Sequence, residues 1–392
     1  MLSQTVKNIS PSLTMKISAL AKQMKANGQD VVNMSIGEPD FFTPEKAKLA
    51  AIDAINKNLT KYDAASGLST LKKIIVQKLK KENKFDAKPE NIVISAGAKQ
   101  SLTNTFLSVL DKDDEVIIPA PYWVSYPELV KISGGKPVFV NTKKENSFLI
   151  TLDELKTAIT PKTKAFILNS PSNPTGSVYK KKQLEEICGF LTEKNILIVA
   201  DEIYERFIYE DSFTSVLSLS KKITDNTILI NGFSKTYSMT GWRVGYSVSP
   251  AELASAMSSL QSHMTSHPCT ISQYAAAAAM SECEIDVTKM CAAYKQRRDY
   301  IVEFFETWKK LDIIKPNGAF YVFVDISPMT KNIHAENNSE ELCHILLSKY
   351  KLACVPGAGF GNDEFIRLSY ACSMENIKKG LSALKACAED LL

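Results

Sequence analysis

The chain has 392 residues, of which 45% are hydrophobic and 23% charged, and its formal net charge is +4. This is the composition of a globular protein with a sizeable core, and the length is enough for two or more domains. The mild, mixed charge argues against a nucleic-acid-binding surface, which needs clustered basic residues. No stretch reaches the ~20 apolar residues that cross a membrane. We expect neither nucleic acid nor a membrane as a partner.

The cysteines and the N-terminus indicate a compartment. The eight cysteines include no Cys-x-x-Cys pair, and with only four histidines no cluster has the spacing of a zinc site. We therefore expect free thiols, a reducing cytoplasm and no metal. Residues 1–29 contain lysines but no acid, as in organellar transit peptides, yet they also lack arginine and the apolar core of a secretory signal.

In chain order, short apolar runs alternate with helix-like stretches such as 98–110 and 180–194. Such alternation predicts an α/β fold with a mostly parallel sheet that helices cover on both faces. We place this large domain at residues 46–284. The basic run 78–84 is interpreted as the solvated end of a helix. The expected strands lie near residues 92–95, 115–118, 137–140, 165–168, 197–200, 227–231 and 244–248.

The C-terminal part predicts a smaller α/β domain at residues 285–392, which the N-terminal segment 1–45 joins. We see no internal repeat and no low-complexity linker, so the domains should pack closely. The elements expected here are a long helix over 287–311, an extended segment over 318–325, and helices over 339–350 and 374–391.

Residues 92–101 read as a strand, a glycine turn and the start of a helix. Free amide groups at Gly97, Ala98 and Lys99 would then point at one spot, which is a suitable place for a phosphate. With one glycine, the segment is also compatible with an ordinary strand-to-helix turn.

Residues 169–176 read Asn-Ser-Pro-Ser-Asn-Pro-Thr-Gly and follow a strand-like run. Two prolines and a glycine fix an unusual turn, which presents Asn173 on a rigid backbone at the end of a strand. Its amide could contact both a ring oxygen of a ligand and a substrate carboxylate. A plain strand-to-helix turn is the alternative.

Residues 196–204 begin with a short apolar run that ends at the acidic residue Asp201, as expected of a buried parallel strand. Ligands of open α/β sheets bind beyond the carboxyl ends of the strands. Asp201 therefore lies where its carboxylate could pair with the pyridine nitrogen of a bound cofactor. Tyr204, three residues further on, could donate a hydrogen bond to the phenolic oxygen of the same cofactor ring. The alternative is that Asp201 caps a helix.

Residues 233–245 read Phe-Ser-Lys-Thr-Tyr-Ser-Met-Thr-Gly-Trp-Arg-Val-Gly and are the most informative stretch. Lys235 can form a Schiff base with an aldehyde, and Arg243 can bind a phosphate through two parallel hydrogen bonds. A cofactor with an aldehyde at one end and a phosphate at the other, such as pyridoxal phosphate, suits this spacing. Alone, the pattern would also fit a solvated loop.

Together the segments resemble the class I pyridoxal-phosphate aminotransferases, and most closely the bacterial aspartate aminotransferases. The resemblance implies the fold type I architecture, with a seven-stranded large domain and a smaller α/β domain, and a cytoplasmic homodimer. It implies reversible transfer of the amino group from aspartate to 2-oxoglutarate. The matching segments, in order, are 35–41, Lys61 and Tyr62, 95–101, 121–126, 173–176, 201–204, 233–245, 318–321, 355–357 and 365–370.

The resemblance also implies roles for the residues, and the catalytic set is Lys235, Asp201 and Tyr204. Lys235 resembles the Schiff-base lysine, Asp201 the partner of the pyridine nitrogen, and Tyr204 a partner of the ring oxygen. The other implied cofactor ligands are Asn173 at the ring oxygen, Trp123 stacked on the ring, and Ser234, Arg243, Gly97, Ala98 and Lys99 at the phosphate. The implied substrate contacts are Gly37, Lys99, Trp123, Asn173 and Arg367, the last at the α-carboxylate.

Tyr62 resembles a tyrosine that reaches the phosphate of the other subunit's cofactor, which would make the active site a property of the dimer. One branch of the family binds the substrate's second carboxylate with an arginine in the region that matches 261–272, where this chain has none. The other branch has a lysine matching Lys99. A solvated first-turn lysine is the alternative interpretation of Lys99.

Other functions remain open at this point. Prephenate or aromatic amino acids are alternative substrates of the same family. Lyases and synthases of the same fold share Lys235 and start from the same carbanion. Regulators with an aminotransferase-like domain carry an added DNA-binding domain, for which 392 residues leave no room.

Overall fold

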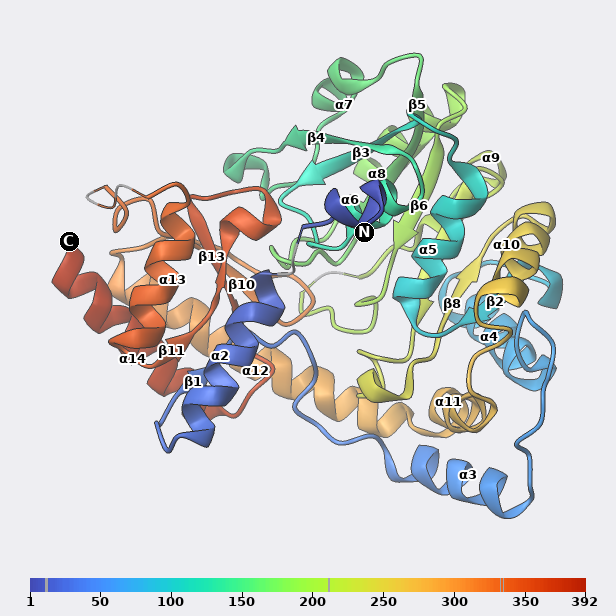
Figure 1. Cartoon of the computed structure of the whole chain (residues 1–392), viewed down its shortest axis with the longest axis horizontal. Helices are drawn as coiled ribbons and strands as arrows, with labels where there is room; N and C mark the ends of the chain where they lie inside the picture. The colour runs from blue at the N-terminus through green and yellow to red at the C-terminus, as the bar shows by residue number, and fades with distance from the viewer. Residues whose placement is uncertain (11–12, 211, 332, 334) are drawn as a thin grey trace.

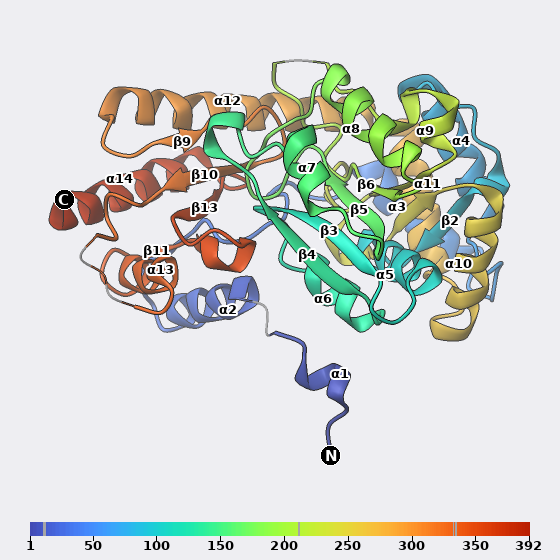
Figure 2. The ribbon, with the colours of Figure 1, turned by 90° about the horizontal axis from the view of Figure 1, so that it is seen from above.

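The fold is taken from a computed structural model of the chain, which is shown in Figure 1. It describes residues 1–10, 13–210, 212–331, 333 and 335–392, without the side chains of 13–16. Figure 2 shows that the short helix α1 (Gln4–Lys7) lies away from the body of the molecule, whereas α2 (Leu13–Ala26) packs beside the C-terminal elements.

A seven-stranded sheet with the order β2-β8-β7-β6-β5-β3-β4 forms the larger part of the molecule. The pairs from β7 to β4 are parallel, and β8 is antiparallel to both of its neighbours. This confirms the prediction of a mostly parallel sheet. The strands are β2 (Ile92–Ser95), β3 (Glu115–Ala120), β4 (Lys136–Asn141), β5 (Thr163–Asn169), β6 (Leu197–Asp201), β7 (Thr227–Gly232) and β8 (Gly245–Val248).

Helices cover both faces of this sheet because successive strand residues point to opposite sides. Val199 belongs to the apolar cluster under one helix layer, whereas its neighbours Ile198 and Ala200 belong to the cluster under the other. The first layer contains α5 (Ala98–Val109), α6 (Tyr126–Ile132) and α10 (Ala251–Met264). The second contains α4 (Ser69–Glu82), α7 (Leu152–Ala158), α8 (Lys181–Glu193), α9 (Lys221–Thr224) and α11 (Thr270–Glu282), and α3 (Glu45–Asn56) packs on α11.

A smaller antiparallel sheet with the order β12-β13-β10-β9 forms the second unit. The helix α12 (Glu284–Trp308) runs from this unit toward α11 (Figure 1). It starts three residues before the predicted range 287–311 and also ends three residues early. The early end follows from Lys309, whose left-handed backbone conformation stops the helix. The other elements are β9 (Ile313–Ile314), β10 (Tyr321–Asp325), α13 (Asn338–Ser348), β12 (Val355–Pro356), β13 (Phe365–Ser369) and α14 (Met374–Leu391).

The N-terminal segment reaches the C-terminal unit through a two-stranded parallel pair, β1 (Val32–Asn33) with β11 (Leu352–Ala353). This pairing is consistent with the division into 1–45, 46–284 and 285–392, which stays a prediction. Short 3₁₀ turns complete the chain at η1 (Pro89–Asn91), η2 (Lys144–Asn146), η3 (Val216–Ser218), η4 (Thr240–Trp242) and η5 (Gly357–Phe360).

The interpretation of residues 78–84 as a solvated helix end is wrong for three of them, of which Leu79 is a core residue and the other two are polar. Lys78 is only 8% exposed and Asn83 only 2%. Lys78 donates to Asn83 Oδ1 at 2.7 Å and forms an ion pair with Glu205, whose other oxygen accepts from Asn83 at 2.9 Å. The partner carboxylate lies on a distant turn, so the local run of charges could not reveal it.

Within the described ranges, no helix combines the length and apolarity that a membrane span requires. Searching the same residues finds no group of three or more histidine, cysteine and acidic side chains placed to hold a metal ion.

Candidate active site

The site lies at the carboxyl edge of the parallel strands. β5 ends at Asn169 and β6 at Asp201, and these two residues are register partners. Asn169 also donates through Nδ2 to the backbone oxygen of Asp201 at 3.0 Å. The adjacent strand β7 leads into the turn that carries Lys235. A cavity of about 330 Å³ opens here, and this size suits a small-molecule ligand.

Most of the predicted site residues line this one cavity, although segments up to 330 residues apart supply them. Those that line it are Gly37, Ala98, Lys99, Trp123, Asn173, Asp201, Tyr204, Ser234, Lys235, Arg243 and Arg367. Their roles toward a ligand stay predictions, but the fold brings them together as the resemblance implies.

Lys235 follows β7 on a turn whose backbone closes on itself, since Met239 N donates to Ser234 O at 3.2 Å. Its Nζ donates to the carbonyl oxygen of Gly37. Burial lowers the pKa of Lys235 to about 8 against the charge of Glu38, and the positive charges of Arg367 and Arg243 lower it further. At neutral pH, a larger fraction of Lys235 than of an ordinary lysine is therefore the free amine, which is the nucleophilic and basic form.

Asp201 is fixed by two hydrogen bonds and is 4% exposed. Tyr126 donates to Oδ2 at 2.7 Å, and the amide of Ile203 donates to Oδ1 at 3.3 Å. Burial raises the pKa of Asp201 to about 6, against these two hydrogen bonds and the charge of Lys235. At neutral pH the group is therefore a buried carboxylate that a protonated ring nitrogen could neutralise.

An anion cradle forms where the β2–α5 turn meets Arg243. Gly97 begins α5 with φ of +85°, and a Cβ at this position would lie 2.4 Å from Arg243 Nη2, so only glycine fits. Arg243 donates to Thr240 O at 2.8 Å and to Ala96 O at 3.3 Å, which holds its guanidinium over the start of the helix. Free helix amides and a guanidinium together suit a phosphate group.

Trp123 presents an aromatic surface to the cavity. Tyr126 meets its ring edge-on with centroids 5.3 Å apart, and the Nζ of Lys99 lies 5.1 Å from the Trp123 centroid. Burial and the nearby charge of Arg243 lower the pKa of Lys99. Lys99 is itself exposed, and its ammonium lies over the Trp123 ring at the cavity, where a cation–π contact can hold it.

Arg367 on β13 is 3% exposed and faces the cavity. Its Nη1 donates to Asn173 Oδ1 at 2.9 Å and its Nη2 to Ser35 O at 2.8 Å. Among the described residues its Nε has no hydrogen-bond partner, and the groups that act on its pKa besides burial are the phenols of Tyr321 and Tyr204, with no carboxylate among them. Because a buried, unpaired charge is costly, Arg367 provides a strong site for a carboxylate from outside the chain.

Two tyrosine hydroxyls meet between these groups, since Tyr204 Oη and Tyr321 Oη lie 2.7 Å apart. The guanidinium carbon of Arg367 lies 4.4 Å from the Tyr321 ring centroid. Tyr204 and Tyr321 are both buried and both line the cavity.

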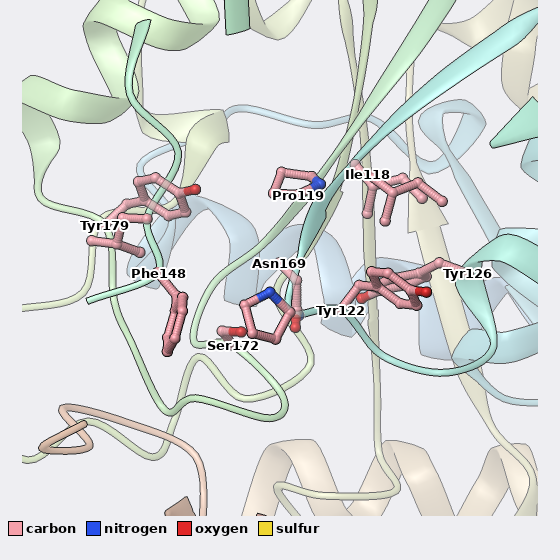
Figure 3. A pocket seen from close by; sticks show the side chains of 11 residues that line it. Ile118, Pro119, Tyr122, Tyr126, Phe148, Asn169, Ser172 and Tyr179 are labelled. Carbon is pink, nitrogen blue, oxygen red and sulfur yellow. The ribbon is translucent and has the colours of Figure 1, made fainter. Parts of the chain in front are cut away.

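A small second hollow adjoins the main cavity and is shown in Figure 3; it has about 30 Å³ of space, enough for one or two water molecules. Tyr126 and Asn169 line both this hollow and the main cavity. Phe148 lines the hollow as well and contacts Phe323 and Phe365 of the smaller sheet edge-on, at 5.9 and 5.2 Å between centroids. The back of the site is thus packed across both units.

Two predicted residues do not line the cavity. Gly97 packs against Arg243, and the prediction of a free amide there is wrong, because Gly97 N donates to Ser95 O at 2.7 Å. Tyr62 is 91% exposed and lines a separate surface hollow with Lys61 and His267. Conversely, sequence reasoning gave no role to Tyr126 and Tyr321. Both lie in segments that carried the resemblance, 121–126 and 318–321. Their place in these segments is the sequence signal that could have marked them as site residues.

Three comparisons with known proteins bear on the family and the fold of the chain. The family model described as aminotransferase class I and II matches residues 29–384. An aspartate aminotransferase of Bacillus sp. (strain YM-2) is 43% identical, with 98% of each chain covered. A probable aspartate/prephenate aminotransferase of Aquifex aeolicus is 42% identical, covering 100% of this chain and 99% of the relative.

Among solved structures, an aspartate aminotransferase of Thermus thermophilus with maleate superposes with a TM-score of 0.93. It is 38% identical, and 99% of each chain is covered.

Proposed function

The chain belongs to the class I and II aminotransferases, and from this premise we propose that it transfers the amino group of aspartate to 2-oxoglutarate with pyridoxal phosphate as its cofactor. The observation that carries the proposal is the pairing of Lys235 and Arg367 in one cavity. Lys235 is an amine with a lowered pKa, and Arg367 is a buried guanidinium without a described carboxylate partner. An amino acid offers a carboxylate to Arg367 and an acidic α-proton to the free amine of Lys235.

The residues present fit the cofactor. The cradle of Gly97 and Arg243 would hold its phosphate, and Asp201 would face its ring nitrogen. Trp123 would stack on the ring, and Tyr204 would reach the ring oxygen. When bound, the cofactor supplies an electron sink for a carbanion at the substrate's α-carbon.

The chain's own groups orient the substrate and move its proton. Arg367 binds the α-carboxylate through its planar fork and so fixes the α-carbon close to Lys235. The free amine of Lys235 takes the α-proton on Nζ and would deliver it to the aldehyde carbon of the cofactor. General acid–base transfer of this kind raises the rate roughly 10²–10⁴-fold. Asp201 stays ionised at neutral pH and keeps the ring nitrogen protonated.

Lys99 supports the preference for a dicarboxylic substrate. Its ammonium lies over Trp123 at the cavity, where the start of α5 already favours anions. A point charge is less selective in geometry than an arginine fork, so we expect aspartate and glutamate as donors and some tolerance of other side chains. Prephenate is the second candidate acceptor, because the relative from Aquifex aeolicus carries both substrates in its name.

The exposed apolar face of α3 supports a homodimer with shared sites. Leu49, Ile52 and Ile55 recur at three-residue spacing and are 52–53% exposed, and Phe42 is 92% exposed. Monomers rarely expose such patches. Because Tyr62 lies outside its own chain's cavity, it is free to complete the phosphate site of a second copy.

One spectroscopic experiment tests the activity. The loaded enzyme is mixed with aspartate alone, and its absorbance spectrum and the released oxaloacetate are measured. We expect conversion to pyridoxamine phosphate with one oxaloacetate per site, followed by recovery on addition of 2-oxoglutarate. Elimination or decarboxylation products without pyridoxamine phosphate would instead identify a lyase. A second mixing series with prephenate as acceptor decides the breadth.

A subunit-mixing experiment tests the assembly. Lys235→Ala and Tyr62→Phe subunits, each impaired alone, should regain activity on mixing, because one site of each mixed dimer then contains both intact residues. Sedimentation at the assay concentration gives the mass, and a fully active monomer would contradict the shared site.

A further inference from the structure

Tyr321 contacts the two halves of the site at once. It lies on β10 and is 1% exposed. Its hydroxyl lies 2.7 Å from the hydroxyl of Tyr204, and its ring lies under the guanidinium of Arg367 at 4.4 Å. It is packed against Gly37 so closely that a Cβ there would lie 2.7 Å from Tyr321 Oη. One phenol thus joins the residue at the cofactor's ring oxygen to the residue at the substrate's carboxylate.

The hydrogen-bond inventory favours one direction for the tyrosine pair. Among the described residues, each hydroxyl has the other as its partner, and one bond uses one of the two protons. If Tyr204 donated to Tyr321, its proton would not be available to a ligand. If Tyr321 donates, the lone pair of Tyr204 is satisfied and its own proton points into the cavity that Asp201 and Lys235 also line.

We propose that Tyr321 is a positioning residue that donates to Tyr204 and thereby fixes Tyr204 as the donor to the cofactor's ring oxygen. The inference rests on the proposed function and adds to it a relay of two hydroxyls, Tyr321 to Tyr204 to the ring oxygen. Donation into Tyr204 polarises its O–H bond, because successive hydrogen bonds in a chain strengthen one another.

Burial keeps both hydroxyls protonated, and the charge of Arg367 acts on both of them. Burial raises the pKa of Tyr321, whereas the charge of Arg367 opposes the rise and makes the phenol a better donor than burial alone would. Burial also raises the pKa of Tyr204 well above its usual range, so its hydroxyl stays protonated. The other charged groups that line the same cavity are Asp201, Lys235, Lys99 and Arg243.

Removal of the Tyr321 hydroxyl should change the cofactor's titration. A donor to the ring oxygen stabilises its anionic form, so a weakened donor makes this oxygen hold the adjacent proton more tightly. In the loaded enzyme, Tyr321→Phe should raise the pH midpoint of the visible absorbance by about 0.2–0.6 units. Tyr204→Phe, which removes the direct donor, should raise it by about 1–2 units.

A double-mutant cycle separates the relay from a general structural effect. If Tyr321 acts through Tyr204, the Tyr321→Phe shift should vanish in the Tyr204→Phe background. A shift of the same size in both backgrounds would overturn the relay, and so would the absence of any shift in the single variant. Because the phenyl ring stays under Arg367, KM for aspartate should remain within about twofold while kcat falls roughly 2–5-fold.

Tyr370→Phe is the matched control. Tyr370 is equally buried and follows β13, but its hydroxyl donates to Ala319 O at 3.3 Å and has no contact with Tyr204. Its substitution should leave the midpoint unchanged. Measurements on the wild type separate the relay hypothesis from the proposed function. A wild-type enzyme that binds no pyridoxal phosphate would refute the proposed function. A wild type that titrates while Tyr321→Phe titrates identically would refute the relay alone.

Discussion

The two halves of the cavity are built in different ways. The cofactor half comes from strand ends and the turns that follow them, so Asp201, Lys235 and Gly97 each lie within a few residues of a strand of one mostly parallel sheet. The carboxylate half depends on contacts between distant segments. Arg367 lies on the smaller sheet and is held by Ser35 and Asn173, which are 332 and 194 residues away. Chemistry that needs a fixed cofactor is thus built locally, and substrate recognition is built across the two units.

Breaking the cofactor half should have the largest effect. Lys235→Ala removes both the covalent anchor and the base, so turnover should fall by at least about 10⁴-fold. The cofactor should still bind through Arg243, Ser234 and the ring contacts. Steady-state assays and equilibrium dialysis measure the two properties. Borohydride reduction of the wild type followed by peptide mapping should label Lys235, and a label on another lysine would refute the assignment.

Breaking the carboxylate half should weaken every amino-acid donor alike. Arg367→Lys keeps the charge but loses the planar fork, and kcat/KM should fall by about 2–4 kcal/mol, or ~30–1,000-fold, for aspartate and alanine alike. Arg298→Lys is the control, because Arg298 is 1% exposed but pairs with Glu210 and Asp299 outside the cavity. A comparable loss in the control would indicate damage to the fold.

Lys99 lies over Trp123 in the cofactor half, and its effect should nevertheless depend on the substrate. Lys99→Ala should lower kcat/KM for aspartate by about 1.5–3 kcal/mol, as expected for a hydrogen bond to a charged group. Alanine has no second carboxylate, so its kcat/KM should change little. Equal losses for both donors would show that Lys99 shapes the cofactor half instead.

The pH dependence of cofactor capture tests the cofactor half alone. Burial lowers the pKa of Lys235 to about 8, so the fraction of nucleophilic free amine rises with pH until this value. The rate at which the apoenzyme incorporates pyridoxal phosphate should therefore increase roughly tenfold per pH unit between about 6 and 8 and then level off. Stopped-flow absorbance measures it. Lys235→Ala should lack this phase, and a flat wild-type profile would contradict the lowered pKa.

The smallest effect is expected where a salt bridge joins the two units. Lys144 of the large unit contacts Asp325 at 2.6 Å and Asp312 at 3.0 Å on the smaller one. Because Lys144 is partly exposed, Lys144→Met should lower the free energy of unfolding by only about 0.5–1 kcal/mol, and less at high salt. Calorimetry gives the change in Tm. Lys221→Met removes an exposed pair with Asp225 within one helix and should change Tm less.

The sequence predicted most of the cofactor half because its signals are local. A buried apolar run followed by an acid places Asp201 at a strand end, and a lone glycine before α5 marks the cradle. Sequence reasoning missed Tyr126 as the donor to Asp201, since a tyrosine at the start of a helix gives no sign of which strand end it faces. It also misjudged Lys78, whose partner Glu205 is 127 residues away.

By itself, the sequence determined the α/β class, the order of the strands along the chain and the identity of the reactive groups, because periodicity, turn residues and side-chain chemistry are properties of short segments. Only the tertiary structure decided how Arg367 is buried without a described carboxylate partner, and how Tyr321 lies between it and Tyr204. These contacts depend on the pairing of β13 with β10 and on the packing of the two units. A contact between two segments that are distant in the chain produces no periodic pattern in the sequence of either segment, so the sequence alone does not reveal it.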